Sequence, residues 1–504
     1  MAGGSVLPGL SVVAVPPQAE PSPLRSDIAG VIGRTRRGPV GQPRRVAGAR
    51  ELESLFGGLD PRFLTGYALR GYLGNGGQVV HVLRLDGAGG IGATGRWELG
   101  DVADAGFGHT RYEIRSTDPG EWADRTRITI DYLNRGGLSF RIEVPGEAPE
   151  FLTGIAPEEV VAALARSRFV RLVPGGPVAN RAPGGSAGPA VKSWEITLDG
   201  GADPVPRRED YLDAARRLGE LMEVALVLVP DLHPDLGAEA VPVLHELLRD
   251  ATERQDRLVL IDLPPDRASP GPAVAWTGAL HDGLPPERRR SAAVYHPWIR
   301  VTDPFGGTRS PLRAVPPSGH VAGLASRLDR ERGAQHTPAN ALLADALDLA
   351  VPLDRDQQSA LTAGGLNVLR CRPGRGLEVW GGRTLDRDPA RRFVAHRRLL
   401  HRLVRAIRRV AEPLVFEPDG PVLRFTLVRA VRSVLLESWR AGGLKGATPD
   451  EGFRVRCDDG NNPPAQTELG QLECEILLAP AAPMEFLRVL LTLTPQGVLA
   501  VVES

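Results

Sequence analysis

The middle of the chain alternates amphipathic segments with short runs of apolar residues. Continuous apolar runs occur within Val224–Asp231, towards the end of Val241–Asp266, and in Ser291–Pro304, and helix-like segments precede or separate them. Apolar strands separated by helices indicate a parallel sheet that is covered on both faces. We therefore expect an α/β unit that begins near Asp210.

The N-terminal region shows a compact pattern of alternating element types. Ser26–Val46 reads as an apolar strand followed by a Gly-Pro turn, Ala49–Gly77 as two helices, and Gln78–Leu85 as a buried strand. Its four glycines follow a helix and precede a strand, which is the reverse of a nucleotide-binding loop. The pattern predicts a β-turn-α-α-β unit without a nucleotide site; these glycines are Gly71, Gly74, Gly76 and Gly77.

Between residues 87 and 192 the sequence becomes rich in glycine and polar residues. Arg111–Ser116, Arg125–Leu133 and Leu138–Val144 alternate apolar and polar positions with a period of two, as half-buried antiparallel strands do. Val173–Pro189 is rich in glycine and reads as a flexible loop. We expect an inserted, outward-facing β-rich module here.

The segment Arg391–Val410 reads as an amphipathic helix that holds eight arginines and no acid. At 100° per residue, apolar side chains such as Leu403 and Ile407 fall on one face, and an arginine stripe lies opposite. Stacked like charges cost stability unless something acidic faces them. Acids of the same subunit, an acidic protein surface or a nucleic-acid backbone could face this stripe, which consists of Arg391, Arg398, Arg402, Arg405 and Arg409.

Beyond this helix we expect a second helix and a C-terminal sheet. Pro421–Arg440 is flanked by helix start and stop signals. Gln471–Pro480 alternates in the manner of a strand, and Phe486–Thr494 and Gly497–Ser504 supply further apolar strand sequence. A free apolar edge strand invites aggregation, and donation of the strand to a neighbour's sheet removes that hazard.

Composition narrows the function classes. The 504 residues predict roughly three domains, and 61 basic residues balance 61 acidic ones. Zero net charge and few stacking aromatics argue against a nucleic-acid-binding protein. Three cysteines far apart in sequence fit a reduced, cytosolic protein. We expect neither a secretory signal nor a membrane-spanning segment.

A hydrolase is the alternative that the α/β region allows. Asp231, Asp262 and Asp303 lie at the ends of expected strands, where α/β folds place active sites. Together with three residues nearby in sequence, they could form a Ser-His-Asp triad; these residues are Ser318, His320 and His336. However, no G-x-S-x-G elbow is present, and no histidine spacing suits a metal. We therefore expect no catalytic, metal or cofactor site, and keep a hydrolase built on residues 210–340 as the alternative.

Several motifs identify a family resemblance. VWGGRTL (Val379–Leu385), VFEP (Val415–Pro418), and the run from SWR to F-x-V-x-C-D within Glu437–Asp458 follow one another in this order. Near the N-terminus stand I-A-G-x-x-G, R-G-P and LFGG. This succession resembles contractile tail sheath proteins, which form the outer cylinder of phage tails and of related injection particles.

The resemblance implies an α/β (α+β overall), multi-domain architecture with no chemical step. It implies a discontinuous core domain made of N- and C-terminal segments, into which a β-rich module and a subtilisin-like but non-catalytic α/β domain are inserted. The expected divisions are an N-terminal arm (1–25), the first core segment (26–86), the β-rich module (87–204), the α/β domain (205–350), the C-terminal core segment (351–485) and a C-terminal arm (486–504).

The resemblance also implies a function and its partners. The subunit would assemble as stacked hexameric rings around an inner tube protein, attach to baseplate and terminal cap proteins, and contract to drive the tube through a target envelope. Assembly would take place in the bacterial cytoplasm. The arginine stripe of Arg391–Val410 becomes the candidate contact with the inner tube. The candidates for strand exchange between subunits are Leu10, Val12, Val13, Val489, Leu491, Val498 and Val501.

Overall fold

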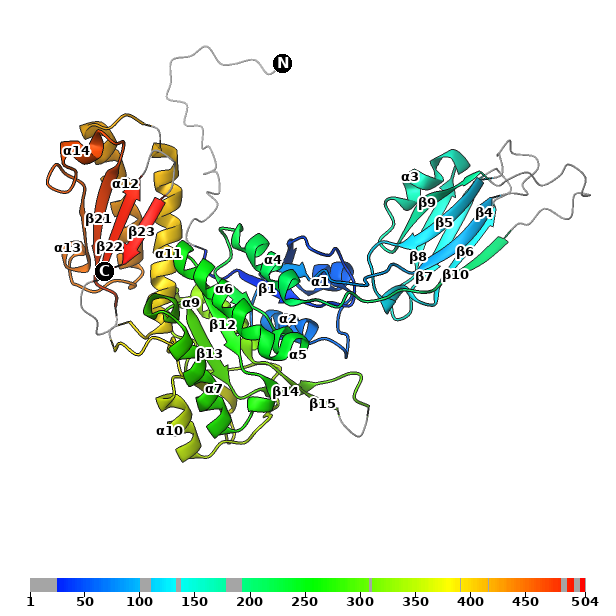
Figure 1. The fold of residues 1–504 in the computed structure, drawn as a ribbon, viewed down its shortest axis with the longest axis horizontal. Helices are drawn as coiled ribbons and strands as arrows, with labels where there is room; N and C mark the ends of the chain where they lie inside the picture. The colour runs from blue at the N-terminus through cyan, green and yellow to red at the C-terminus, as the bar shows by residue number, and fades with distance from the viewer. Residues whose placement is uncertain are drawn as a thin grey trace, which may run out of the picture.

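The structure is a computed structural model of the chain. It describes residues 25–99, 110–132, 137–177, 193–307, 311–389, 391–415, 417–481, 487–493 and 499–503. Figure 1 shows a central body, a β-rich module that projects from one side of it, and a C-terminal body on the other side.

The central body is built on a nine-stranded sheet in the order β16-β19-β18-β13-β12-β11-β1-β3-β2. The strands from β18 to β3 run parallel, and the pairs at both ends of the sheet are antiparallel. The strands are β1 (Ala29–Gly33), β2 (Arg44–Ala47), β3 (Val79–Arg84), β11 (Leu226–Leu228), β12 (Leu258–Asp262), β13 (Ala292–His296), β16 (Ala341–Leu342), β18 (Asn367–Arg372) and β19 (Gly376–Trp380).

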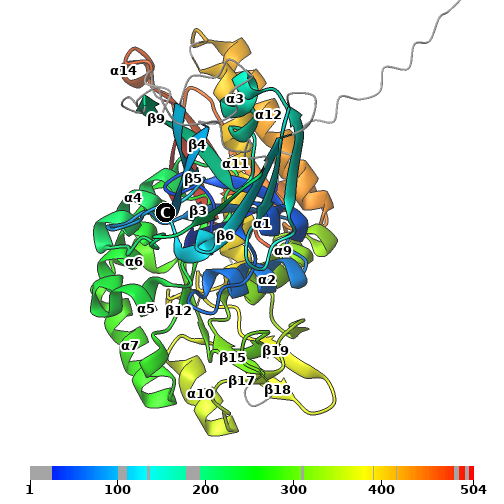
Figure 2. The same ribbon diagram turned by 90° about the vertical axis from the view of Figure 1, so that its right-hand side faces the viewer.

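Both faces of this sheet are buried, as the continuous apolar strands predict. Along β12, Leu258 and Leu260 belong to one apolar cluster, and Val259 and Ile261 belong to the other. Figure 2 shows a helix layer on each side of the sheet. One layer holds α1 (Ala49–Phe56), α2 (Thr65–Gly74) and α9 (Ser318–Arg332), and the other holds α4 (Arg208–Gly219), α6 (Ala240–Arg254), α7 (Pro270–Gly283) and α10 (Arg355–Ala363).

Smaller elements complete the central body. A three-stranded sheet in the order β15-β14-β17 lies beside the main sheet. The remaining elements are β14 (Ile299–Thr302), β15 (Leu312–Val315), β17 (Asp348–Leu349), α5 (Leu232–Leu236) and α8 (Pro286–Arg289).

The N-terminal unit lies in one sheet with the α/β region. We expected a core domain of N- and C-terminal segments into which the α/β domain is inserted; β1 pairs with β11 in the register Ala29↔Leu226, so the N-terminal unit and the α/β region share one sheet. Residues 367–380 join the same sheet through β13 and β18. Periodicity could not reveal this, because buried apolar strands look alike and carry no signal for which neighbour they choose.

The projecting module consists of antiparallel strands in two sheets. Their orders are β10-β6-β7-β8 and β4-β5-β9, and inward side chains such as Trp97, Ile130 and Phe140 share one apolar core. The prediction of half-buried antiparallel strands, made from the alternating sequence, is thereby confirmed. The elements are β4 (Thr94–Leu99), β5 (Thr110–Ser116), β6 (Thr126–Tyr132), β7 (Leu138–Glu143), β8 (Glu150–Ile155), α3 (Val160–Leu164), β9 (Val170–Pro177) and β10 (Ser193–Leu198).

The C-terminal body packs helices against a four-stranded antiparallel sheet, β20-β21-β22-β23. Alternate residues of β21 are buried, as predicted, and the second long helix spans the predicted Pro421–Arg440. The elements are α11 (Val394–Ala411), α12 (Pro421–Arg440), α13 (Pro449–Gly452), β20 (Phe453–Arg456), α14 (Pro464–Thr467), β21 (Leu472–Leu478), β22 (Leu487–Leu493) and β23 (Leu499–Glu503).

Candidate functional site

Helix α11 joins the C-terminal body to the central body. Its apolar side chains, among them Leu403 and Ile407, pack into the core that α12 and β21 share. The arginines on its other side reach into the central body, where acids and backbone carbonyls meet them. The helix is therefore covered along both of its long faces.

Two arginines carry most of this junction. Arg398 is 3% exposed and donates from Nη2 to the Oδ2 atom of Asp329 at 2.5 Å and to the carbonyl oxygen of Ser26 at 3.2 Å. Arg405 donates to the carbonyl oxygens of Asp256 and, at 3.0 Å, of Arg25. These contacts tie α11 to α9, to the start of β12 and to the segment before β1.

Burial sets the electrostatics of this junction. It raises the pKa of Asp329, although Arg398 stands beside that carboxylate, and it lowers the pKa of Arg405 to about 10. The Oγ atom of Ser26 donates a second hydrogen bond to Asp329 at 2.6 Å. A buried ion pair of this kind specifies geometry, because separating it strands a charge in a medium of low dielectric constant.

The structure corrects the expected role of the arginine stripe. Arg398 and Arg405 lie inside the chain, so neither can face an inner tube without leaving its partners. Arg402 is half-buried, and Arg391 is half-buried beside Asp388 with 3.4 Å between Nε and Oδ2. Only Arg409 of the five is exposed. Of the three partners considered for the stripe, acids of the same subunit supply the main contacts.

The residues proposed for the hydrolase alternative do not form a catalytic triad. Ser318 is fully buried, and its Oγ atom donates to Asp262 at 2.5 Å while its backbone N–H donates to the other carboxylate oxygen at 3.0 Å. His320 is buried against Gly71, whereas His336 is exposed. The hydrogen bonds of Ser318 therefore join it to an acid at the N-terminus of α9, and no histidine among the described residues is hydrogen-bonded to it as a base.

Burial without a charged partner raises the pKa of Asp262 to about 7. The same cause lowers the pKa of His320 to about 4. Perturbed groups often mark active sites, but such sites must be open to a substrate. Asp262 and Ser318 are both buried, so we assign them to the structure of the α9 N-terminus.

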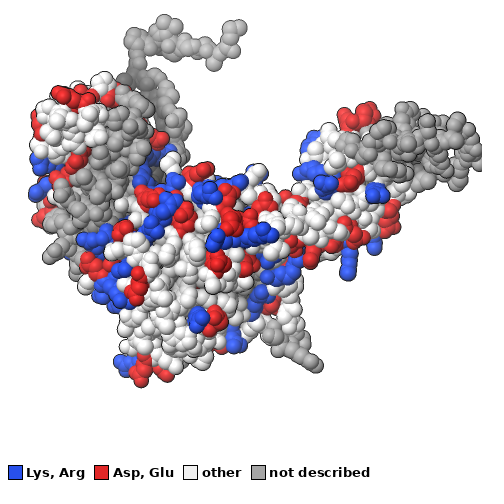
Figure 3. Space-filling view, in the orientation of Figure 1, with Lys and Arg blue, Asp and Glu red and all other residues white. Residues whose placement is uncertain are grey.

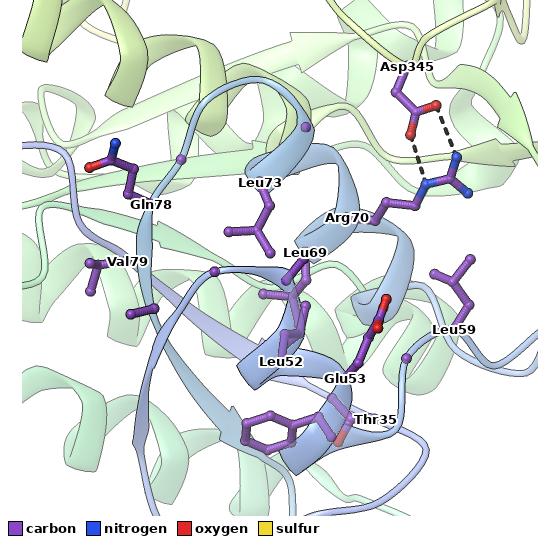
Figure 4. Close-up of a pocket in the computed structure, with 18 residues that line it drawn as sticks. Thr35, Leu52, Glu53, Leu59, Leu69, Arg70, Leu73, Gln78, Val79 and Asp345 are labelled. Atoms are coloured by element: carbon purple, nitrogen blue, oxygen red, sulfur yellow. Dashed lines mark hydrogen bonds and ion pairs between the residues drawn. The ribbon is translucent and has the colours of Figure 1, made fainter. Parts of the chain in front are cut away.

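An apolar groove lies between α1, α2 and the strands β2 and β3, with a volume of about 940 Å³. Figure 4 shows Leu52, Leu69 and Leu73 around it, with the ion pair of Arg70 and Asp345 at its rim. The Nε–Oδ2 distance of that pair is 2.9 Å. The groove offers surface for packing, and its lining includes no nucleophile paired with a base.

Four of the strand-exchange candidates lie outside the described residues; they are Leu10, Val12, Val13 and Val498. Val489 and Leu491 lie in β22, which pairs along its length with β21 of the same chain, and Val501 lies in β23 at the edge of that sheet. In this subunit the C-terminal strands therefore complete their own sheet, and the outer edges of β20 and β23 are its two borders.

Helix α12 presents the surface that sequence reasoning missed. At 100° per residue one stripe lies opposite the buried Val431. It includes Val422, which is 80% exposed, and Phe425, which is 67% exposed. The spacing of these apolar residues away from the core stripe is the signal that could have found it. We define the α12 outer face as Val422, Phe425, Arg429, Arg432, Ser433 and Arg440, all exposed.

Surface charge, metal ligands and membrane-spanning helices were the remaining features to compare with the described residues. Acidic and basic side chains are interspersed over the central body in Figure 3, in agreement with zero net charge. No group of three or more His, Cys, Asp or Glu side chains in the described part of the chain could hold a metal ion. Of the helices that the structure describes, none is long and apolar enough to cross a membrane.

A comparison with known protein families matches the middle of the chain. Residues 208–385 match the family model of the phage tail sheath protein central domain. The tail sheath protein of Vibrio phage KVP40 is 28% identical over 180 residues, which are 35% of this chain and 26% of that protein. The match therefore spans about a quarter of the length of this relative.

Solved structures extend the likeness to nearly the whole chain. The sheath tail protein of Listeria innocua superimposes with a TM-score of 0.65 at 13% identity, over 94% of this chain and 96% of that one. The helical sheath of the anti-feeding prophage in its contracted state gives 0.56 at 20% identity, over 96% and 98%. At these identities the likeness is one of fold. The chain is therefore similar to phage tail sheath proteins in its central domain, and nearly its whole length shares their fold.

Proposed function

We propose that this chain is the subunit of a contractile sheath, which polymerises as stacked rings around an inner tube and shortens to drive that tube through a target envelope. The observation that carries the proposal is the shared fold over 96% of the chain with a sheath in its contracted state. The role is mechanical, and the sealed position of Ser318 supports a subunit without hydrolytic chemistry. The hydrolase alternative has no comparable support.

The fold suits a subunit that must move as connected bodies. The ion pair of Arg398 and Asp329 fixes α11 against the central body, while the β-rich module projects away from both (Figure 1). In the proposed assembly the module makes outer contacts between subunits, and strand exchange through the terminal segments keeps the lattice connected during contraction. The partners are further copies of the chain, the tube, a baseplate and a terminal cap, assembled in the bacterial cytoplasm.

The contact with the inner tube belongs to the α12 outer face rather than to α11. This face combines three exposed arginines with exposed Val422 and Phe425, and the one acid of the helix, the exposed Glu437, lies at its margin. Asp450, on another element, lies 3.5 Å from Arg432. Such a face fits an acidic partner surface, because complementary charge steers association and apolar anchors supply affinity.

Charge reversal on the two helices tests this assignment. We expect Arg429→Glu with Arg440→Glu to abolish co-purification of a co-expressed tube protein, because repulsion replaces attraction across the interface. Arg409→Glu, on the exposed end of α11, is the matched control and should leave it intact. Pull-down from cells that express both proteins measures the difference. Loss with Arg409→Glu alone would return the tube contact to α11.

A further inference from the structure

Cys457 and Cys474 face each other across two antiparallel strands of the C-terminal sheet. The register of β20 and β21 ends with Arg456 opposite Glu475, so the next pair is Cys457 and Cys474. The side chains of Asn461 and Asn462 donate to the carbonyl oxygen of Glu473 at 3.0 and 2.9 Å, which holds the chain after β20 against β21.

The backbone spacing at such a position suits a disulfide bond. Directly opposed residues of antiparallel strands have Cα atoms about 4.5 or 5.5 Å apart, depending on the hydrogen-bonding pattern. Disulfides join Cα atoms about 4.4–6.8 Å apart. Both spacings lie within that window, and both side chains belong to the apolar core of the C-terminal body.

The two thiols differ in access and in acidity. Cys474 is buried, whereas Cys457 is half-buried. The neighbouring Cys474 thiol lowers the pKa of the Cys457 thiol against the opposing effect of burial, and the positive charge of Arg424 lowers it further. The neighbouring Cys457 thiol, together with burial, raises the pKa of Cys474. Because the thiolate is the reactive form, Cys457 is the nucleophile and Cys474 the partner that resolves.

We propose that Cys457 and Cys474 form a dithiol site that reacts with low-molecular-weight disulfides and closes to an intramolecular disulfide. The Cys457 thiolate attacks one sulfur of oxidised glutathione and releases one glutathione thiolate, which takes up a proton. Cys474 then loses its proton and attacks the Cys457 sulfur of the mixed disulfide, which releases the second glutathione. Two cysteine thiols are oxidised, and one disulfide is reduced to two thiols.

The closed bond fastens residues 458–473, which leave the sheet after β20, form α14 and return to β21. Leu469 in this excursion is 69% exposed. A cross-link that closes a loop restricts the unfolded chain and stabilises the folded body. The reaction itself does not depend on the proposed function. The biological role of the disulfide does rest on the proposed function, because a released particle would meet oxidising surroundings in which the bond persists.

Mass spectrometry of the full chain tests the site. The exposed Cys371 is first replaced, so that Cys371→Ser leaves only the pair. After native treatment with oxidised glutathione and alkylation, we expect no alkylated cysteine, no glutathione adduct, and a peptide that links Cys457 with Cys474. The thermal transition of the C-terminal body should rise by roughly 5 °C. Two alkylated cysteines after treatment would overturn the proposal.

Single variants in the same background separate the two roles. With Cys474→Ser, Cys457 should keep a glutathione adduct, because nothing resolves the mixed disulfide. With Cys457→Ser, Cys474 should stay free and be alkylated only after unfolding. Equal adduct formation on both cysteines would contradict the assigned roles. Whether cylinders assemble is a separate observation, so a failure here and a failure of the sheath assignment remain distinguishable.

Discussion

At the scale of single residues, the molecule places several charged groups where water does not reach them. Arg398 and Asp329 are each less than a tenth exposed, at the junction of two bodies. Asp262 and Ser318 close the start of α9 in the same way. Such groups stabilise the fold only while their partners remain, since a buried charge or polar group without a partner is costly.

Removing one member of the junction pair should expose that cost. We expect Arg398→Ala to lower the free energy of unfolding by about 3–5 kcal/mol, because Asp329 is then left buried without its cation. Arg409→Ala, on the same helix but exposed, should change it by less than about 0.5 kcal/mol. Urea denaturation of the full chain, followed by circular dichroism, measures both. Equal effects of the two variants would mean that the junction pair contributes nothing.

The carboxyl of Asp262 predicts a pH dependence of stability. Its pKa is about 7 in the folded chain and near 3.9 when unfolded, so the native state binds the extra proton between these values. Stability from this group is therefore present at low pH and is lost as pH rises from about 4 to 7. Asp262→Asn keeps the geometry around Ser318 and should flatten this decline.

The buried histidines act in the opposite direction. Burial lowers the pKa values of His233, His296 and His320 to about 4, so the folded chain resists their protonation. Their contribution is complete above about pH 6.5 and is lost as pH falls towards 4. Melting temperatures of the chain and of the Asp262→Asn variant between pH 4 and 8 separate the contribution of Asp262 from that of the histidines. A difference between the two proteins that does not change with pH would contradict the assignment to Asp262.

At the scale of elements, helices α2 and α9 approach each other through glycine. A Cβ atom at Gly319 would overlap the carbonyl oxygen of Ala68, and one at Gly323 would overlap that of Tyr72. Neither obstacle is a flexible side chain, so the helices would have to separate. The close contact lets α2 of the N-terminal unit pack on α9 of the central region, and it thereby supports the shared sheet beneath them.

Substitution of one glycine tests this contact. We expect Gly323→Ala to destabilise the chain by about 2 kcal/mol or more, because overpacking displaces backbone. Gly278 lies within α7 with nothing near the position of a Cβ atom. Gly278→Ala should therefore leave stability unchanged or raise it by up to about 1 kcal/mol, through better helix propensity. Thermal unfolding of the two variants gives the comparison. A Gly323→Ala protein as stable as the parent would show that α2 and α9 do not meet as described.

The elements themselves were largely predictable from sequence, whereas their partners were not. The alternation of Leu472, Cys474 and Ile476 predicted strand β21, and the residues that flank Pro421–Arg440 predicted helix α12, because local burial produces a periodic sequence pattern. The pairing of β1 with β11 produces no such pattern in the sequence. The arginines of α11 showed that a partner for their charge was needed, but the acids of the central body lie far away in sequence. The opposition of Cys457 and Cys474 likewise depends on the register of two strands.

At the scale of the whole molecule, three bodies of different construction are joined at two places. The β-rich module is connected to the central body through paired backbone at Ala88 with Val205 and Ile91 with Ala202. The C-terminal body is connected through α11 and its buried arginines. Hydrogen-bonded joints of this kind suit a subunit whose bodies keep their internal structure while contacts between subunits rearrange, as the sheath proposal requires.

Electron cryo-microscopy of the chain co-expressed with its tube protein tests the central claim most directly. We predict striated cylinders whose helical reconstruction places the α12 outer face against the tube and the β-rich module on the outside. The same preparation without the tube protein is the control for assembly by the chain alone. Uniform monomers in both preparations, at concentrations where sheaths assemble, would contradict the account, as would cylinders with the β-rich module lining the lumen.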